Sequence, residues 1–319
     1  MTSRVVLGCT SMTPHSYPDS PRRAEMVDVL RGALAAGVDT FDTSEIQGPF
    51  TGEELLGEAL GGRGTVVTKF GWEIEDGTPT GRLNSRPEVI RASAEGSLRR
   101  LGRDQLDVYL QHRVDPQVPI EEVAGTIGEL IQEGKVARFG LCEAAPDTIR
   151  RAHAECPLSV IQHEYSLWTR GPEATVLPVA RELGLDVMAY SPLGKGFLAG
   201  SAQPNDDSSS PRLHAENFAA NQQLAQALFA LAEEWGMTSA QLALGWLLAQ
   251  GADIYPVAGS TNLERIRANA AAQPLGPAQV EAVDAAVAAH PVAGARYTDK
   301  HLSFMDAGLE TDSGTGQKP

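Results

Sequence analysis

The sequence predicts an α/β protein built as a (β/α)₈ barrel of the TIM type. Short apolar runs rich in β-branched residues alternate along the chain with longer segments that have the period of amphipathic helices. Eight such strand-like runs occur, and a helical segment or a long loop follows each one. Eight strand-then-helix units are arranged more economically as a closed parallel barrel than as an open doubly wound sheet.

The predicted strands are apolar runs of five to seven residues. Each is short enough for a strand and is separated from the next by a stretch with a different period. They cover residues 4–8, 38–42, 65–70, 106–112, 136–141, 158–163, 185–190 and 253–257.

The predicted helices between these strands place apolar residues at i, i+3 and i+4. The clearest helical segments cover residues 22–37, 86–102, 120–134 and 172–184. A glycine ends each of these segments, and Pro87 and Pro172 lie near the first turn of two of them. Glycine after the last turn and proline in the first turn are the usual signals of helix ends.

Three segments that follow strands are longer than the repeat requires: 71–85, 191–220 and the region beyond 290. In a barrel of this type the loops after the strands form the catalytic face, so we expect the active site there. Within the second segment, residues 199–212 are rich in Ser, Asp and Pro, which predicts a mobile flap. We expect a single barrel domain over residues 1–308 and a disordered tail over 309–319.

Composition narrows the classes of function. The net charge is −15, and we see no basic stripe, which argues against nucleic acid or an anionic membrane as a partner. No apolar run approaches the length of a membrane span and no signal segment opens the chain, so we expect a cytoplasmic protein that acts on a small molecule. Cys9, Cys142 and Cys156 lie far apart, which predicts free thiols and no metal site.

Polar side chains end several predicted strands and therefore meet at one face of the barrel. The second strand ends in Asp42, the third delivers Lys69, and the fourth ends in His112. Gln162 and Tyr190 come from later strands in the same way. A carboxylate, an ammonium and an imidazole at one barrel mouth predict an enzyme active site.

At this point the chain resembles the aldo-keto reductases. The resemblance runs along nearly the whole sequence and looks closest to the bacterial branch that carries QHRVDP and EYSLWTR. The motifs that carry it are VDTFDTSEI, EELLGEAL, VVTKFG, LDVYLQHRVDPQVPIEEV, LIQEGKVARFGLCEA, VIQHEYSLWTR, VMAYSPLGKGFLAG and AGSTNLERIRANAAA.

The family resemblance implies NADPH as hydride donor and a catalytic tetrad of Asp, Tyr, Lys and His. Asp42, Lys69 and His112 match three members of this tetrad. The family shows a pattern like DTSxxYG, whereas this chain reads DTSEIQG, so the tyrosine position holds Gln47. An amide can donate a hydrogen bond to an oxyanion, but it has no proton to release to the product.

Loss of a general acid costs on the order of 10²–10⁴ in rate unless another group replaces it. His112 and Lys69 are the first candidates for that replacement. Tyr17, in the loop after the first strand, is a weaker one. His163 follows Gln162 on its strand, and alternation predicts that it points away from the barrel interior in a structural role.

The resemblance and the residue chemistry together predict a dinucleotide site. Gln162 suits the nicotinamide carboxamide, Tyr190 suits stacking on its ring, and Cys142 stands where the family often has serine. The segment 191–198 offers backbone N–H groups and a lysine for the pyrophosphate, and the helix after Ser260 offers an N-terminus that favours phosphate. The expected cofactor residues are Cys142, Glu143, Gln162, Tyr190, Ser191, Leu193, Lys195, Gly196, Gly259, Ser260, Thr261, Asn262, Arg265 and Asn269.

We expect NADP(H) in preference to NAD(H), although no further basic residue lies near Gly259 or Thr261 to meet the 2′-phosphate. The family commonly has an N-terminal β-hairpin that closes the barrel bottom, and only residues 1–3 precede the first strand here. An uncovered barrel bottom favours burial against another segment or another subunit, so a homo-oligomer is among the expected arrangements.

Three hypotheses about function follow. The first is an NADPH-dependent reductase whose acceptor needs little proton donation: an activated carbonyl, a conjugated C=C or an imine, in specialised metabolism. The second is a non-redox enzyme on the same barrel that uses Lys69 and His112 for elimination, isomerisation or cyclisation. The third is a cofactor-sensing binding protein. The sequence does not rank the acceptors, because the pocket loops carry no recognisable ligand pattern.

Overall fold

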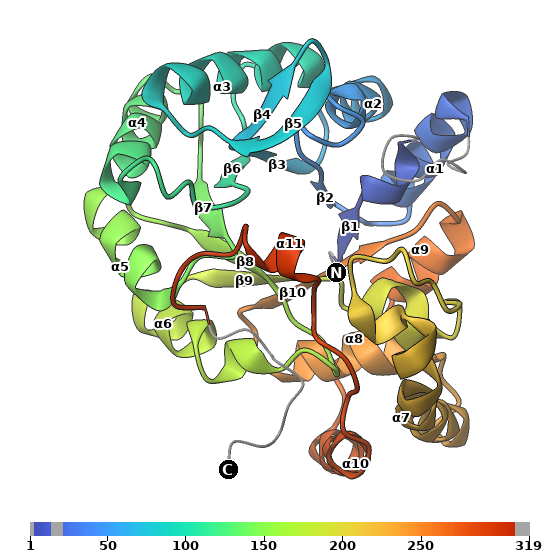
Figure 1. Cartoon of the computed structure of the whole chain (residues 1–319). Coiled ribbons are helices and arrows are strands. Elements are labelled where there is room, and N and C mark those ends of the chain that lie inside the picture. The colour runs from blue at the N-terminus through green and yellow to red at the C-terminus, as the bar shows by residue number, and fades with distance from the viewer. Residues whose placement is uncertain (1–2, 14–21, 310–319) are drawn as a thin grey trace.

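The computed structural model describes residues 3–13 and 22–309 and shows a closed barrel of parallel strands inside a ring of helices (Figure 1). The predicted (β/α)₈ fold is confirmed. The barrel order is β1-β10-β9-β8-β7-β6-β3-β2, and the pairing of β1 with β10 closes it. The barrel strands are β1 (Val6–Gly8), β2 (Thr40–Asp42), β3 (Thr65–Phe70), β6 (Val108–Gln111), β7 (Phe139–Cys142), β8 (Val160–Glu164), β9 (Asp186–Tyr190) and β10 (Ile254–Gly259).

Several strands begin later than their apolar runs suggested. Leu106 and Val136 pair through an isolated parallel bridge, but the regular ladder starts only at Val108 and Phe139. An apolar run marks burial, and burial extends beyond the residues that exchange regular hydrogen bonds. The element types were therefore predicted better than their ends.

The helices cover the outside of the barrel. They are α1 (Arg23–Ala35), α2 (Thr51–Leu60), α3 (Pro87–Leu101), α4 (Ile120–Gln132), α5 (Pro146–Glu155), α6 (Val176–Leu183), α7 (Ala215–Glu234), α8 (Ser239–Ala249), α9 (Leu263–Ala270) and α10 (Pro277–Ala289). The last helix, α11 (Asp299–Leu302), lies across one end of the barrel instead. Gly102 and Gly184 end α3 and α6 at φ values of 64° and 68°, the left-handed conformation in which glycine carries no Cβ penalty.

The core has two layers, as a filled barrel requires. Alternation along the strands sends one set of side chains into the barrel and the other set toward the helices. The interior layer contains Val6, Val67, Val108, Leu110, Val160, Met188 and Val257. The outer layer packs apolar helix faces against the strands, and it is the larger of the two. The barrel interior is thus filled with side chains.

The first long segment after a strand folds as an antiparallel hairpin of β4 (Trp72–Glu75) and β5 (Thr78–Leu83). The second contains two 3₁₀ helices, η3 (Gly194–Ala199) and η4 (Pro211–Leu213). The part expected to form a mobile flap is held by hydrogen bonds from the Asn205 amide to the Leu213 carbonyl and from the Ala215 amide to the Asp206 carboxylate. These hydrogen bonds give the segment a defined path, which composition does not report.

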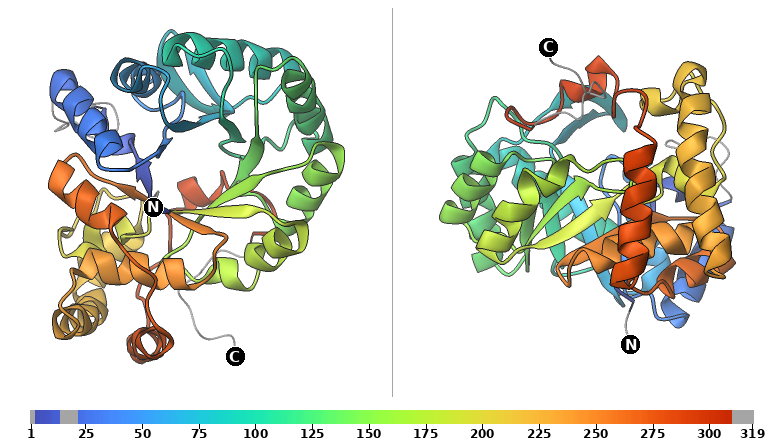
Figure 2. Two further views of the ribbon diagram at one scale, coloured as in Figure 1. Left: turned by 180° about the vertical axis from the view of Figure 1, so that it is seen from behind. Right: turned by 90° about the horizontal axis from the view of Figure 1, so that it is seen from below.

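The chain beyond residue 290 crosses the end of the barrel where the strands finish. Figure 1 shows α11 in front of the strands, and the right-hand view of Figure 2 shows it at one end of the molecule. Thr298 N–H donates to the Ser209 carbonyl, Ala145 N–H donates to the Asp306 carboxylate, and Phe304 packs edge-on against Trp72 at 4.9 Å. This C-terminal segment therefore ties together the loops that surround the site.

No hairpin precedes β1 in the described part of the chain, and the predicted tail lies outside that part except for Leu309, which packs on the core. Tyr17 also lies outside the described residues. Among the same residues, no helix is both long enough and apolar enough to pass through a bilayer.

Candidate active site

The ends of the barrel strands open into a cleft of about 1410 Å³. All four predicted catalytic residues line it: Asp42, Gln47, Lys69 and His112. Twelve of the predicted cofactor residues line it as well: Cys142, Gln162, Tyr190, Ser191, Leu193, Lys195, Gly196, Gly259, Ser260, Thr261, Arg265 and Asn269. Glu143 and Asn262 do not line this cleft, and both have other partners described below. The barrel thus brings together residues that lie far apart in the sequence.

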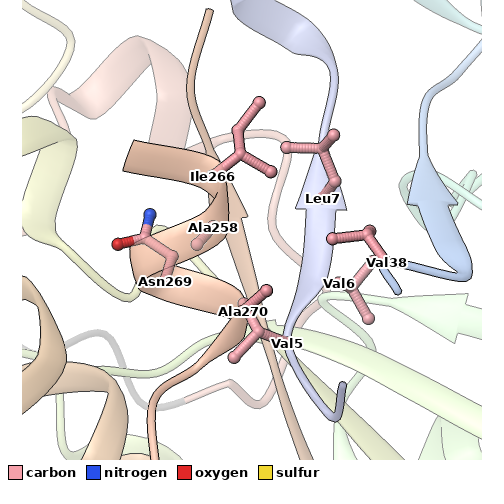
Figure 3. A pocket seen from close by; sticks show the side chains of 8 residues that line it. All are labelled: Val5, Val6, Leu7, Val38, Ala258, Ile266, Asn269 and Ala270. Atoms are coloured by element: carbon pink, nitrogen blue, oxygen red, sulfur yellow. The ribbon is translucent and has the colours of Figure 1, made fainter. Parts of the chain in front are cut away.

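A second, much smaller pocket lies between β1 and α9 (Figure 3). It encloses about 10 Å³, and its lining is apolar apart from Asn269, which also borders the cleft. That volume corresponds to about one water molecule, so the pocket is a packing defect between strand and helix. The cleft is the place for a cofactor and a substrate.

Asp42 and Lys69 form a closed network at the base of the cleft. The Lys69 ammonium lies 2.8 Å from each Asp42 carboxylate oxygen and 2.7 Å from the Thr43 carbonyl oxygen. The Gln162 amide donates to the Asp42 Oδ2 atom at 2.7 Å. Since an ammonium has three N–H groups, these partners occupy every donor of Lys69. The ion pair is buried, and no N–H of Lys69 remains to serve another group.

Gln47 lies in the turn after β2, and its amide is held at both ends. Its Nε2 atom donates to the Thr10 hydroxyl at 2.7 Å, and its Oε1 atom accepts from the Thr43 hydroxyl at 3.1 Å. Gly48 adopts a φ of 97°, and a Cβ there would lie 1.9 Å from the Thr51 hydroxyl oxygen, so the turn requires glycine. One N–H of the Gln47 amide has no acceptor among the described residues and is available to a ligand.

His112 follows β6 and is half-buried at the cleft wall. Burial, followed by the charges of Arg113 and Lys69, lowers the pKa of His112 well below its usual range. Its Nδ1 atom has no hydrogen-bond partner among the described residues. The imidazole is therefore neutral near neutral pH, and it can donate a hydrogen bond without acting as an imidazolium acid.

The residues expected near a nicotinamide occupy the next strands of the barrel. The Tyr190 hydroxyl lies 3.3 Å from the Tyr297 hydroxyl and accepts from Arg296 at 3.4 Å, which fixes the ring at the cleft wall. Burial raises the pKa of Cys142 to about 11, and the nearby charge of Arg113 offsets this only in part. Cys142 therefore stays a thiol near neutral pH.

Sequence reasoning missed an ionic cluster behind this wall. Arg296, from the C-terminal segment, lies 2.6 Å from the Glu143 carboxylate and 3.2 Å from that of Glu164. Burial alone would raise the pKa of Glu143, but Arg296 and weaker positive neighbours lower it to about 2. Burial lowers the pKa of His163 to about 4, and this imidazole lies 3.9 Å from Glu143. The unusual length of the chain beyond 290 was the one signal of this cluster.

Arg113 was also missed, although it stands in the quoted motif QHRVDP beside His112. It lines the cleft, and its Nη1 atom donates to the His112 carbonyl at 2.6 Å and to the Cys142 sulfur at 3.3 Å. The guanidinium therefore spans the ends of β6 and β7. Motif matching assigned a role to the histidine and left its neighbour unexplained.

The far end of the cleft has the features of a phosphate site. Ser260 and Thr261 line it just before α9, and the Asn262 side chain caps that helix by accepting from the Arg265 amide at 3.0 Å. Gly259 permits close approach of the backbone, because a Cβ there would lie 3.2 Å from the Gly8 carbonyl. An N-terminal helix end beside open backbone favours an anion.

In the described ranges, no three His, Cys, Asp or Glu side chains are placed to hold a metal ion.

Comparison with known proteins agrees with this geometry. The model of the aldo/keto reductase family matches residues 4–288. The chain belongs to that family. Among curated proteins, the probable aldo-keto reductase 1 of Glycine max is 39% identical over 319 residues, which cover 96% of this chain and 92% of that protein. The predicted family and enzyme class, an oxidoreductase of the aldo-keto reductase type, are confirmed.

Solved aldo/keto reductases share the fold of this member. The glycerol dehydrogenase of Gluconobacter oxydans has a TM-score of 0.80 and 28% identity, over 91% of this chain and 92% of that chain. An aldo/keto reductase of Klebsiella pneumoniae, solved in complex with NADP and acetate, has a TM-score of 0.71 and 26% identity, over 93% and 95% of the two chains.

Proposed function

We propose that this aldo/keto reductase transfers a hydride from NADPH to a small, activated acceptor: a carbonyl, an enone or an imine. The observation that carries the proposal is the amide of Gln47, fixed by Thr10 and Thr43 in the cleft that also contains Lys69 and His112. An amide stabilises developing negative charge by hydrogen bonding but supplies no proton. An acceptor that is already electrophilic tolerates that limitation best.

The residues of the cleft fit a nicotinamide dinucleotide. At one end, Tyr190 offers a ring fixed by its hydroxyl contacts, and at the other, Ser260 and the N-terminus of α9 suit phosphate groups. Arg265 lines the same end and is exposed, as a guanidinium that meets a 2′-phosphate would be. The Klebsiella relative, whose structure holds NADP, supports NADP(H) over NAD(H). When bound, such a cofactor supplies the hydride.

The protein's own residues then orient the acceptor. Gln47 has one N–H left for the acceptor heteroatom, and His112 offers a second, neutral donor. Lys69 is held by Asp42 and Thr43, so its charge acts from the base of the cleft without a direct bond. Because neither Lys69 nor His112 presents a readily released proton, the proton that completes the product comes from water.

The test is a rate comparison over matched acceptors, measured as loss of NADPH absorbance in a stopped-flow instrument. We expect enones, imines and activated carbonyls to react about 10²-fold faster than simple aldehydes and ketones, since the latter depend most on general acid catalysis. Equal rates for simple aldehydes and activated acceptors would contradict the proposal. They would mean that another donor, His112 or Tyr17, replaces the tyrosine.

A further inference from the structure

Arg113 differs from the other cations of the cleft. Lys69 is paired with Asp42, and Lys195 and Arg265 are exposed to solvent. Arg113 is half-buried, and within the described chain no carboxylate lies at ion-pair distance from it. A cation that is partly withdrawn from water without a counter-ion is costly, so its presence in an enzyme cleft points to a ligand.

The guanidinium has donors to spare. Its two Nη1 hydrogens serve the His112 carbonyl and the Cys142 sulfur. A guanidinium carries five N–H groups, so the Nε hydrogen and both Nη2 hydrogens remain without an acceptor among the described residues. The Nε and Nη2 edge is the fork that binds the two oxygens of a carboxylate side by side.

Nearby acids do not satisfy this edge. Glu143 acts on Arg113 electrostatically, but its carboxylate contacts Arg296 at 2.6 Å and accepts from the Glu164 amide at 2.8 Å. Tyr190 acts on Arg113 in the same way, and its hydroxyl is engaged by Tyr297. The remaining acceptor must therefore come from outside the described chain.

The position of Arg113 separates this site from the cofactor's phosphate end. Arg113 follows His112 directly and touches Cys142, whereas Ser260 and Arg265 lie beyond β10. An anion on Arg113 thus lies beside the place of hydride transfer. Ile46 and Pro79 line the cleft as apolar groups, and they suit a small hydrocarbon substituent.

We propose that Arg113 binds the carboxylate of the substrate and that this enzyme reduces small 2-oxo carboxylates. The inference deepens the proposed function and rests on it. A carboxylate neutralised by a guanidinium withdraws more electron density from the adjacent carbonyl than a free one does. The substrate would then supply part of the activation that an amide at position 47 does not.

The reaction balances without a further reactant. The acceptor carbon gains the hydride from NADPH and forms a C–H bond, while the carbonyl π pair moves onto oxygen. Gln47 and His112 donate hydrogen bonds to that oxygen, and water protonates it. The products are a 2-hydroxy carboxylate, NADP⁺ and hydroxide, so two electrons pass from the cofactor to the substrate.

The kinetic test uses benzoylformate and its neutral amide, benzoylformamide, which share the same ketone. In Arg113→Gln we expect kcat/KM for benzoylformate to fall about 10- to 100-fold, mainly through KM, since hydrogen bonds to charged groups contribute about 1.5–3 kcal/mol. The rate with the amide should change less than about threefold. For Arg113→Lys, which keeps the charge without the fork, kcat/KM for benzoylformate should lie between the values of the wild type and of Arg113→Gln. Equal losses for acid and amide would overturn the proposal.

The matched control is Arg138→Gln, at the start of β7 and the opposite end of the barrel. It removes one exposed positive charge without contacting the cleft, so it corrects for net charge. We expect it to leave the acid-to-amide ratio unchanged. A fall in this ratio equal to that of Arg113→Gln would attribute the effect to net charge and overturn the proposal.

A binding measurement separates this inference from the proposed function. By calorimetry with NADP⁺ present, oxamate should bind the wild type and bind Arg113→Gln at least about tenfold more weakly, while the Kd for NADP⁺ stays the same. If NADP⁺ affinity falls instead, Arg113 serves the cofactor and the proposal fails. If no acceptor is reduced but oxamate binding depends on Arg113, the function fails and the anion site stands. If enones are reduced and oxamate does not bind, the proposed function stands and the carboxylate site at Arg113 fails.

Discussion

Asp42 and Glu45 are both buried carboxylates, three residues apart, in opposite surroundings. Asp42 faces the cleft and is bonded by Lys69 and Gln162. Glu45 is buried and does not line the cleft; it accepts a hydrogen bond from Ser93, and no described lysine or arginine is at ion-pair distance from it. Burial is the main cause that raises the pKa of Glu45 to about 7.

The difference shows what burial does to a carboxylate with and without a cation. The ammonium of Lys69 gives all its donors to Asp42 and Thr43, so this side of the segment holds a fixed ion pair. The other side holds a carboxylate whose charge depends on pH. Gln47 stands at the end of the same segment and brings no charge at all. In the predicted catalytic network, Lys69 therefore has no free donor, and position 47, where the chain departs from the family pattern, carries no charge.

Breaking the fixed pair should have the largest effect. Lys69→Met leaves the Asp42 carboxylate buried without its cation, which costs about 3–5 kcal/mol of unfolding free energy. Urea unfolding measures this loss, and hydride transfer should disappear with it. Lys135→Met is the control, because Lys135 pairs with Glu95 and Glu133 at the surface, where a pair contributes less than about 1 kcal/mol. Similar losses for both variants would show that the Asp42 pair is not special.

Glu45→Gln tests the buried carboxylate that has no cation beside it. The pKa of Glu45 is about 7 in the folded protein, whereas in the unfolded chain it has the ordinary value of 4.5 for a glutamate. Below about pH 4.5, burial of Glu45 therefore does not lower the unfolding free energy. As the pH rises from about 4.5 through about 7, the unfolding free energy falls. Glu45→Gln mimics the protonated form.

The unfolding free energy of Glu45→Gln should exceed that of the wild type by almost nothing at about pH 4.5 and by at most about 3 kcal/mol near pH 8. Urea unfolding at the two pH values checks this. Glu88→Gln, in the exposed first turn of α3, removes the same charge and should show no such rise. A gain that does not grow with pH would mean that Glu45 is already charged without cost in the folded state.

Gln47→Tyr should have the smallest effect of the three. A phenol near Lys69 and His112 restores a general acid, so we expect reduction of a simple aldehyde to rise about 10- to 100-fold, a part of the 10²–10⁴ that acid catalysis contributes. The reaction with the natural acceptor should slow, because the larger ring fills space shaped for an amide. Stopped-flow rates measure both.

Gln47→Phe is the matched control, since it adds the ring without the hydroxyl and should give no gain. Adding Lys69→Met to Gln47→Tyr should remove the gain, because the phenol then lacks a nearby positive charge. A wild-type enzyme that already reduces simple aldehydes as fast as Gln47→Tyr would show that position 47 does not limit the reaction.

Much of the site could be predicted because a barrel brings strand ends together. Asp42, Lys69 and Gln162 each end or nearly end a strand, so their convergence in one cleft follows from the fold. Arg296 could not be found in this way. It lies more than a hundred residues from Glu143 and reaches it only because the C-terminal segment crosses the barrel mouth. Periodicity predicts strands and helices, but it does not predict the path of an irregular segment.

The sequence by itself determined the barrel and the glutamine at position 47, because periodicity, glycine at helix ends and the order of motifs are local properties. The tertiary structure alone decided which donors are used and which remain. Lys69 has no spare N–H because Asp42 and Thr43 converge on it, and Arg113 keeps a free fork because Glu143 is bound to Arg296. Satisfaction of a donor depends on groups distant in the chain, so it appears only when the chain has folded.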